Sequence, residues 1–377
     1  MTGGPPAGAA WRVARLEVTD LRCWRRAELE LPPGLVVVCG PNGAGKTSLV
    51  EAVVLATLGV SPRTAQLSEL VRHGSPALRV AADMEGPSRT RREIGYAAGI
   101  GRRLVADGVG VRQLAAWRLP GAVLVFVPEE LRAVKGPPAA RRRALDRLLE
   151  AVTPGFAEDA AAYQEALAQR NALLRRARSG EGDVRAAFPW EARLAAHGAR
   201  IALARRRELA WLAEPYARWL EALGGGPGGR LALEGSPSAV EGDDEEALEA
   251  GLRAHLERMR PREVAAGMTI SGPHRDDVWI GAGDHDLRKL GSQGEQRTAA
   301  LALLLAHRER LLAAGTQPVL LLDDVLSELD PVRRAALLGA VEGSGQVILT
   351  AADPEAHATA GARDATVVRV REGTIAA

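Results

Sequence analysis

Several classes of protein are excluded by what the sequence lacks. It has two cysteines, Cys23 and Cys39, too few for a disulfide framework or a cysteine-based metal site. No apolar run approaches the ~20 residues that a membrane-spanning helix needs, and the longest, 299–306, ends at charged residues. The start of the chain is uncharged and lacks the basic region of a signal peptide. We therefore interpret residues 1–10 as a flexible tail on a cytoplasmic protein without a membrane partner.

Aromatic residues and lysine are also scarce. Phe, Trp and Tyr make up 3% of the chain, too little for a surface on which many bases stack. The formal net charge of +2 does not by itself indicate a nucleic-acid partner. Lysine occurs only at positions 46, 135 and 289, although the chain has 49 basic residues. A chain that otherwise uses arginine keeps Lys46, where a compact ammonium group is needed between phosphates.

Lys46 belongs to a phosphate-binding loop. Residues 40–47 fit the pattern G-x-x-x-x-G-K-[ST] at every position, between a predicted buried strand at 35–39 and a predicted helix at 47–58. In such a loop the backbone N–H groups converge on phosphates, Lys46 neutralises their charge and Thr47 binds Mg²⁺. We therefore expect ATP and Mg²⁺ as cofactors. The expected ATP-binding residues of the loop are Gly40, Pro41, Asn42, Gly43, Ala44, Gly45, Lys46, Thr47 and Ser48.

The matching acidic residue lies near the other end of the chain. Val319 to Leu322 predict a buried strand that ends at Asp323, and we expect Asp323 to join Thr47 in binding magnesium. Asp324 follows, and we predict that it positions the attacking water, with Lys46 as the other catalytic residue; a second structural carboxylate is the alternative. ATPases of the ABC type usually carry glutamate there, so the shorter aspartate predicts slow hydrolysis.

A short segment before the acidic strand suggests an ATP site shared between two subunits. Residues 292–296 read Ser-Gln-Gly-Glu-Gln and precede a long predicted helix. Alone, this pattern is explained by a helix cap followed by glutamate. Together with the early loop and the late acid, it is typical of an ABC-type ATPase head. We therefore expect Ser292, Gly294 and Asp330 to complete the ATP site of a partner subunit. Thr350 stands where such heads carry a switch histidine.

The chain between the two halves of the ATP site is predicted to be helical. Helices are expected at 141–152, 156–178, 189–223 and 245–260, a flexible turn at 224–229, and strands at 268–272 and 277–280. The predicted fold class is α/β: an ABC-type, Rad50-like ATPase head of mixed sheet and helices with an inserted α-helical arm. We place the head at 11–128 and 263–377 and the arm at 129–262.

Several segments resemble one family closely. They are Ser271 to Asp277 (SGPHRDD), Ser292 to Arg297 (SQGEQR), Tyr163 to Asn171 and Leu321 to Asp330, and they are similar to the RecF family of bacterial DNA replication and repair proteins. The resemblance implies a dimer that forms on ATP binding and binds single-stranded and gapped duplex DNA. It also implies cooperation with RecR and RecO, and through them loading of RecA. Arg63, in a Pro-Arg-Thr segment where the family often has His-Arg-Thr, is the implied nucleotide-lid residue.

Clusters of arginine are the candidate DNA contacts, since guanidinium groups bind phosphate without reading sequence. Solvated faces in an arginine-rich chain explain about half of them equally well. The clusters are Arg89 to Arg92, Arg102–Arg103, Arg141 to Arg143, Arg175 to Arg178 and Arg205 to Arg207. If DNA binds, we expect weak, DNA-stimulated ATP hydrolysis. A transporter ATPase subunit is disfavoured, because the two halves of the ATP site lie too far apart and a helical arm separates them. A long-armed tether is disfavoured, because the arm is short and has no C-x-x-C hook. The alternative kept open by Asp324 is a module that holds ATP as a structural ligand without hydrolysing it.

Overall fold

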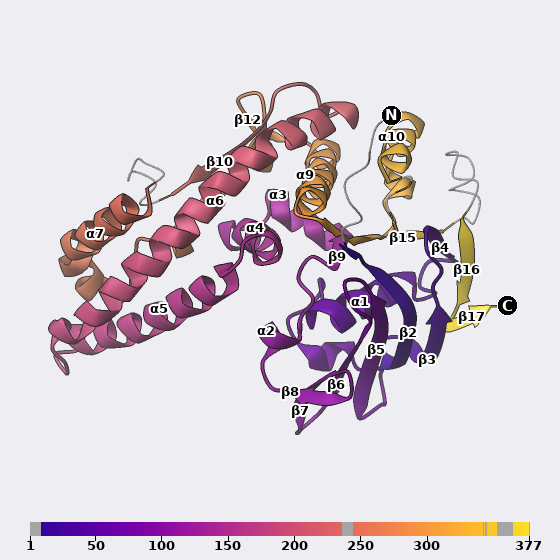
Figure 1. The fold of residues 1–377 in the computed structure, drawn as a ribbon, viewed down its shortest axis with the longest axis horizontal. Coiled ribbons are helices and arrows are strands. Elements are labelled where there is room, and N and C mark those ends of the chain that lie inside the picture. The colour runs from indigo at the N-terminus through magenta and orange to yellow at the C-terminus, as the bar shows by residue number, and fades with distance from the viewer. Residues whose placement is uncertain (1–8, 236–243, 342, 344, 353–364, 377) are drawn as a thin grey trace. The chain divides into compact units, whose positions relative to one another are not determined.

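The computed structural model describes residues 9–235, 244–341, 343, 345–352 and 365–376 (Figure 1). Contacts group the chain into two compact units. We call residues 1–131, 219–225 and 297–377 the head unit, and residues 132–218 and 226–296 the arm unit. The arm unit thus begins close to the expected residue 129, but it continues past 262 to Gln296. Of the expected tail at 1–10, Ala9–Ala10 (β1) pair with Thr316–Gln317 (β13), and residues 1–8 lie outside the described residues.

A six-stranded sheet carries the predicted ATP-site segments. Its order is β17-β16-β4-β15-β14-β9, parallel except for β17. The strands are β4 (Leu35–Cys39), β9 (Val123–Phe126), β14 (Val319–Leu322), β15 (Val347–Ala351), β16 (Thr366–Arg371) and β17 (Thr374–Ala376). The apolar runs of β4 and β14, and of Val347 to Leu349 in β15, are what a parallel sheet covered on both faces requires. Because parallel strands end at the same edge, the segments after β4 and β14 meet there.

The second sheet of the head unit is antiparallel. Its order is β3-β2-β5-β6-β7-β8. The strands are β2 (Arg12–Leu21), β3 (Trp24–Glu30), β5 (Ala77–Glu85), β6 (Thr90–Ala97), β7 (Gly101–Ala106) and β8 (Val109–Val111). Helix α1 (Lys46–Leu58) is buried almost all round and contacts strands of both sheets, so one apolar core joins the two sheets through this helix.

Three further α-helices lie wholly or mainly within the described part of the head unit. They are α2 (Leu114–Trp117), α10 (Pro331–Val341) and the larger part of α9 (Gln293–Ala313), whose first residues belong to the arm unit. Helix α9 confirms the long helix expected after Ser292, and its residues 299–306 are all buried. The longest apolar run of the sequence is therefore core packing. Among the described residues, no helix has the length and apolar character needed to cross a membrane.

The arm unit is mainly helical and confirms the helices predicted from the sequence. Long helices α5 and α6 lie side by side (Figure 1), and buried Arg170 of α5 bonds to Glu191 of α6 at 2.9 Å. The helices are α3 (Arg132–Lys135), α4 (Pro138–Val152), α5 (Phe156–Arg178), α6 (Phe188–Ala222), α7 (Glu245–Ala266) and α8 (Leu287–Leu290). The last residues of α6 belong to the head unit.

A small sheet in the arm unit differs from the expectation. It contains β10 (Gly229–Glu234), β11 (Asp277–Ala282) and β12 (His285–Asp286), of which only β11 was predicted. The prediction of a strand at 268–272 is wrong. There the backbone N–H groups of Thr269 and Ile270 donate to the side chains of Asn171 (2.7 Å) and Glu263 (2.9 Å) instead of to a neighbouring strand. Side-chain partners of this kind cannot be seen in an alternation of apolar residues.

Candidate ATP-binding site

The predicted phosphate loop lies between β4 and α1 and depends on its glycines. Gly43 and Gly45 have φ values of 80° and 105°, in the left-handed region that favours glycine. A Cβ atom on Gly45 would lie 2.6 Å from Trp24 Nε1, and one on Gly40 would lie 2.2 Å from the Val370 carbonyl oxygen. Gly45 also caps α1, whose first backbone N–H groups have no partner within the helix. Such a helix start suits an anion.

Lys46, the first residue of α1, is held inside the loop. It is 8% exposed, and its ammonium group donates to the carbonyl oxygens of Gly40 (2.7 Å) and Pro41 (3.1 Å). The loop therefore concentrates one buried positive charge beside the free N–H groups of the helix start. This combination provides the charge and the hydrogen-bond donors that a polyphosphate needs.

Asp323 meets the phosphate loop from the other end of the sequence. It directly follows β14, its backbone N–H donates to Phe126 O at 2.8 Å, and its side chain is buried. Burial raises the pKa of the Asp323 carboxyl, and hydrogen bonds from Thr350 and Thr47 partly oppose the rise. The hydroxyl of Thr47 and the carboxylate of Asp323 are thus adjacent, and both are the hard oxygen ligands that Mg²⁺ prefers. These two residues fit the magnesium site that the sequence predicts.

Asp324 is held in an uncommon backbone conformation. Its φ is +51°, in the left-handed region. Its N–H donates to Thr350 Oγ1 at 2.8 Å, and its carbonyl oxygen accepts from Ser327 Oγ at 3.0 Å. The side chain is half-buried, and its negative charge acts on Arg297, opposing the drop that burial causes in the pKa of that guanidinium. Asp324 thus lies beside Asp323 with a distinct, fixed backbone.

Arg63 joins the site through a buried carboxylate that the sequence analysis missed. Its guanidinium lies 3.4 Å from Glu129 and 4.0 Å from Glu51. Glu51, in α1, is fully buried and also accepts from Arg22 at 2.9 Å and 3.1 Å. A buried ion pair needs such multiple partners. Glu51 therefore ties the segment of Arg63 to the helix that follows the phosphate loop. A charged residue within an apolar helical run was the signal for it.

The predicted signature segment begins α9 and lies in the arm unit. Ser292 N–H donates to Glu295 Oε2 at 2.7 Å, and Glu295 N–H donates to Ser292 Oγ at 3.3 Å. This reciprocal pair is a capping box. The structure therefore contains the helix cap that can by itself explain the Ser-Gln-Gly-Glu-Gln pattern. Around Gly294 nothing lies where a Cβ would be. Asp330 precedes α10, is exposed, and accepts from Arg333 N–H at 2.9 Å.

Three of the arginine clusters proposed for DNA each contain a member that the structure places in ion pairs within the fold. Arg141 is buried and pairs with Asp277, and Arg205 is buried and pairs with Asp146 and Asp276. In the head unit, Arg91 pairs with Glu17 and Asp83. These guanidinium groups hold the fold together. The exposed members of the clusters are Arg89, Arg102, Arg103, Arg143, Arg175, Arg176, Arg178 and Arg207, and the half-buried ones besides Arg91 are Arg92, Arg142 and Arg206.

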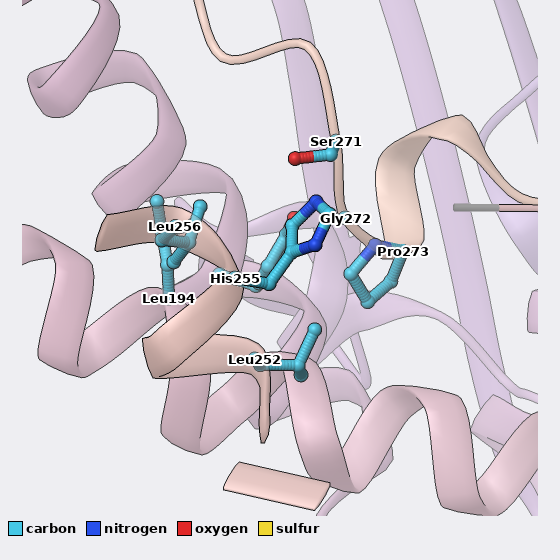
Figure 2. A pocket seen from close by; sticks show the side chains of 8 residues that line it. Leu194, Leu252, His255, Leu256, Ser271, Gly272 and Pro273 are labelled. Carbon is cyan, nitrogen blue, oxygen red and sulfur yellow. The ribbon is translucent and has the colours of Figure 1, made fainter. Parts of the chain in front are cut away.

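A small hollow in the arm unit is too small for a ligand. Tyr163, Leu252, His255 and Gly272 are among the residues that line it, and Figure 2 shows the leucines and His255 around it. Its free volume is about 10 Å³, roughly the space of one water molecule. His274 follows Pro273, which also lines this hollow, and its Nδ1 lies 2.8 Å from Tyr163 OH. The S-G-P-H-R-D-D segment is therefore packed into the arm unit.

Comparison with solved structures defines the class. The chain aligns with the Smc head domain with an extended coiled coil from Pyrococcus furiosus, with a TM-score of 0.57 and 14% identity over 97% of this chain and 95% of that one. A model described as an AAA domain matches residues 15–83. Together with the phosphate loop and the late acidic pair, this gives the chain the fold of an ABC-type, SMC-like ATPase head with an inserted helical arm.

Closer relatives define the family. The DNA replication and repair protein RecF of Acidothermus cellulolyticus is 40% identical over 93% of this chain and 96% of its own length. The protein of the same name from Anaeromyxobacter dehalogenans is 37% identical over 97% and 98%. A solved structure of the recombination mediator RecF with ATP, from the RecFOR pathway, superposes with a TM-score of 0.87 at 26% identity, over 98% of this chain and 99% of that one. The chain belongs to the RecF family of DNA replication and repair proteins.

Proposed function

We propose that this protein is an ATP-dependent DNA-binding protein of recombinational repair and replication. The observation that carries the proposal is the meeting of Thr47 and Asp323, which come from opposite ends of the chain and lie close enough that Thr47 lowers the pKa of the Asp323 carboxyl. Few structural reasons bring a phosphate-loop hydroxyl to a buried carboxylate, and a nucleotide with its metal ion is the simplest one. The family and the ATP-bound relative support the same assignment.

In this proposal each residue of the site has one task. Residues Gly40 to Ser48 bind ATP, with Lys46 neutralising the β- and γ-phosphates, and Arg63 lies beside the nucleotide. Thr47 and Asp323 hold Mg²⁺, which supplies positive charge against the phosphate oxygens. Asp324 orients the attacking water. Aspartate is shorter than glutamate by one methylene group, so the proposed hydrolysis of ATP is slow. Binding of DNA stimulates it.

The proposal includes a homodimer that forms on ATP binding. Ser292, Gly294 and Asp330 of each subunit complete the ATP site of the other. Exposed Ser292 and Asp330, together with the open space at Gly294, support this role, since a partner phosphate needs access to these groups. The dimer binds single-stranded DNA and gapped duplex, works with RecR and RecO, and through them helps to load RecA. Hydrolysis of ATP releases the DNA.

ATP binding and turnover, each with and without gapped DNA, test the proposal. We expect ATP to bind with micromolar affinity and to turn over slowly, faster with DNA. Tight binding of ATP with no turnover under any condition would favour the alternative in which ATP is a structural ligand. Absence of ATP binding would contradict the proposal as a whole.

A further inference from the structure

One hydroxyl group connects the two acidic residues of the site. Thr350 lies in β15, between β14 and β4, and is fully buried. Its hydroxyl donates to Asp323 Oδ1 at 2.7 Å and accepts the N–H of Asp324 at 2.8 Å. The Thr350 hydroxyl thus bonds to two consecutive residues, as a donor to Asp323 and as an acceptor from Asp324. A hydroxyl is the smallest group that can make both bonds at once.

The backbone of Asp324 needs such a contact. A non-glycine residue in the left-handed region is held there only when its surroundings determine it. Two hydrogen bonds hold the Asp324 backbone here: its N–H donates to Thr350 Oγ1, and its carbonyl oxygen accepts from Ser327 Oγ. The direction of the Asp324 side chain follows from this backbone. Thr350 therefore controls where the Asp324 carboxylate points, and it ties that direction to the position of Asp323.

We infer that Thr350 is a positioning residue for ATP hydrolysis. The inference rests on the proposed function and deepens it. In this role Thr350 fixes Asp324 in the orientation from which its carboxylate aligns the attacking water, and its hydrogen bond to Asp323 Oδ1 steadies that residue beside Thr47. A misplacement of a catalytic group by about 1 Å can cost ~100-fold in rate. Loss of the hydroxyl should therefore slow hydrolysis without weakening ATP binding.

The experiment compares Thr350→Val, which keeps the shape and loses the hydroxyl, with Thr350→Ser, which keeps the hydroxyl. Thr57→Val is the matched control, because Thr57 is also fully buried and its hydroxyl donates only to the backbone of its own helix. Thr350→Ala serves as the second variant if the valine variant does not fold. Three quantities are measured: hydrogen exchange of the Asp324 amide in the nucleotide-free protein, the Kd for ATP, and kcat.

We expect the Asp324 amide to exchange faster in Thr350→Val, with a Kd for ATP within about twofold of wild type and kcat lower by at least about tenfold. Thr350→Ser and Thr57→Val should resemble wild type in all three quantities. Wild-type kcat in Thr350→Val, or an equal loss in Thr350→Ser, would overturn this inference and leave the proposed function standing. A wild-type protein that binds ATP without turning it over would overturn both the inference and the proposed hydrolysis.

Discussion

Arg141 and Asp277 form a two-pronged ion pair: Arg141 Nε lies 2.6 Å from Asp277 Oδ1, and Arg141 Nη2 lies 2.7 Å from Oδ2. The arginine is 3% exposed. Its remaining nitrogen donates to the carbonyl oxygens of Val134 and Gly136. This side chain stood among the candidate DNA contacts, but it links α4 to the start of β11 within the arm unit.

We therefore predict that Arg141→Ala lowers stability and leaves DNA contacts intact. Removing Arg141 leaves the carbonyl oxygens of Val134 and Gly136 without this donor, whereas Asp277 keeps Arg288 at 3.1 Å. We therefore expect a cost of about 1–3 kcal/mol in the free energy of unfolding. Urea unfolding measures the loss. Arg175→Ala is the comparison, since Arg175 is exposed in the last turn of α5, and it should change the free energy of unfolding by less than about 0.5 kcal/mol. Equal stability of the two variants would contradict the prediction.

Lys46→Arg and Asp324→Asn should each abolish ATP hydrolysis while leaving the protein folded. Lys46 occupies a narrow place between two carbonyl oxygens of the loop, where a planar guanidinium does not fit as an ammonium does. Asp324→Asn keeps the backbone contact to Thr350 but removes the charge that orients water. We expect turnover to fall at least about 100-fold, with unchanged melting temperature. Full turnover in Asp324→Asn would show that this residue is only structural.

His274 should make the protein sensitive to acid. Burial lowers its pKa to about 4 from the ordinary 6.5, and the neutral ring accepts from Tyr163 OH at Nδ1. Because the folded protein favours the neutral ring, His274 contributes stability that is complete above about pH 6.5, and this contribution is lost as the pH falls toward 4. The loss is on the order of 3 kcal/mol. We expect His274→Gln to flatten the fall in unfolding free energy between pH 7 and pH 5.

Asp276 changes the free energy of unfolding with pH in the direction opposite to His274, so a separate variant tests it. Burial raises the pKa of its carboxyl to about 6, against 3.8 ordinarily, and Arg205 partly opposes the rise. Its contribution to stability is therefore complete below about pH 4 and is lost as pH rises through 6. Asp276→Asn should steepen the loss of stability in acid, because the compensating group is gone. Parallel pH profiles for wild type and both variants would contradict these assignments.

The sequence was sufficient to predict the features that depend on local pattern. The phosphate loop, the buried strands that precede it and Asp323, and the long helices of the arm all follow from apolar periodicity and a motif of fixed spacing. The family resemblance rested on other short segments, among them Ser271 to Asp277 and Ser292 to Arg297. Pairing of β14 with both β9 and β15 then brings together residues that lie far apart in the chain.

Features that depend on partners distant in sequence were not predictable. Thr350 attracted notice only as a missing histidine, because its two hydrogen bonds require the register of β15 against β14. Glu51 stands out in the sequence as a charge within an apolar helical run, but its partners Arg22 and Arg63 are known only from the structure. Arg141 and Arg205 read as exposed basic clusters, since a run of arginines does not reveal which members meet carboxylates.

The central claim is that ATP joins two copies of this chain through Ser292, Gly294 and Asp330. Light scattering tests it most directly, by measuring the mass of the protein with ATP and Mg²⁺, with ADP, and without nucleotide. Ser292→Arg is compared with Glu295→Gln, which retains the capping of α9 through an amide, and melting temperatures confirm that both variants fold. The account predicts a dimer with ATP alone, lost in Ser292→Arg and kept in Glu295→Gln. A monomer under every condition, including with gapped DNA, would contradict it.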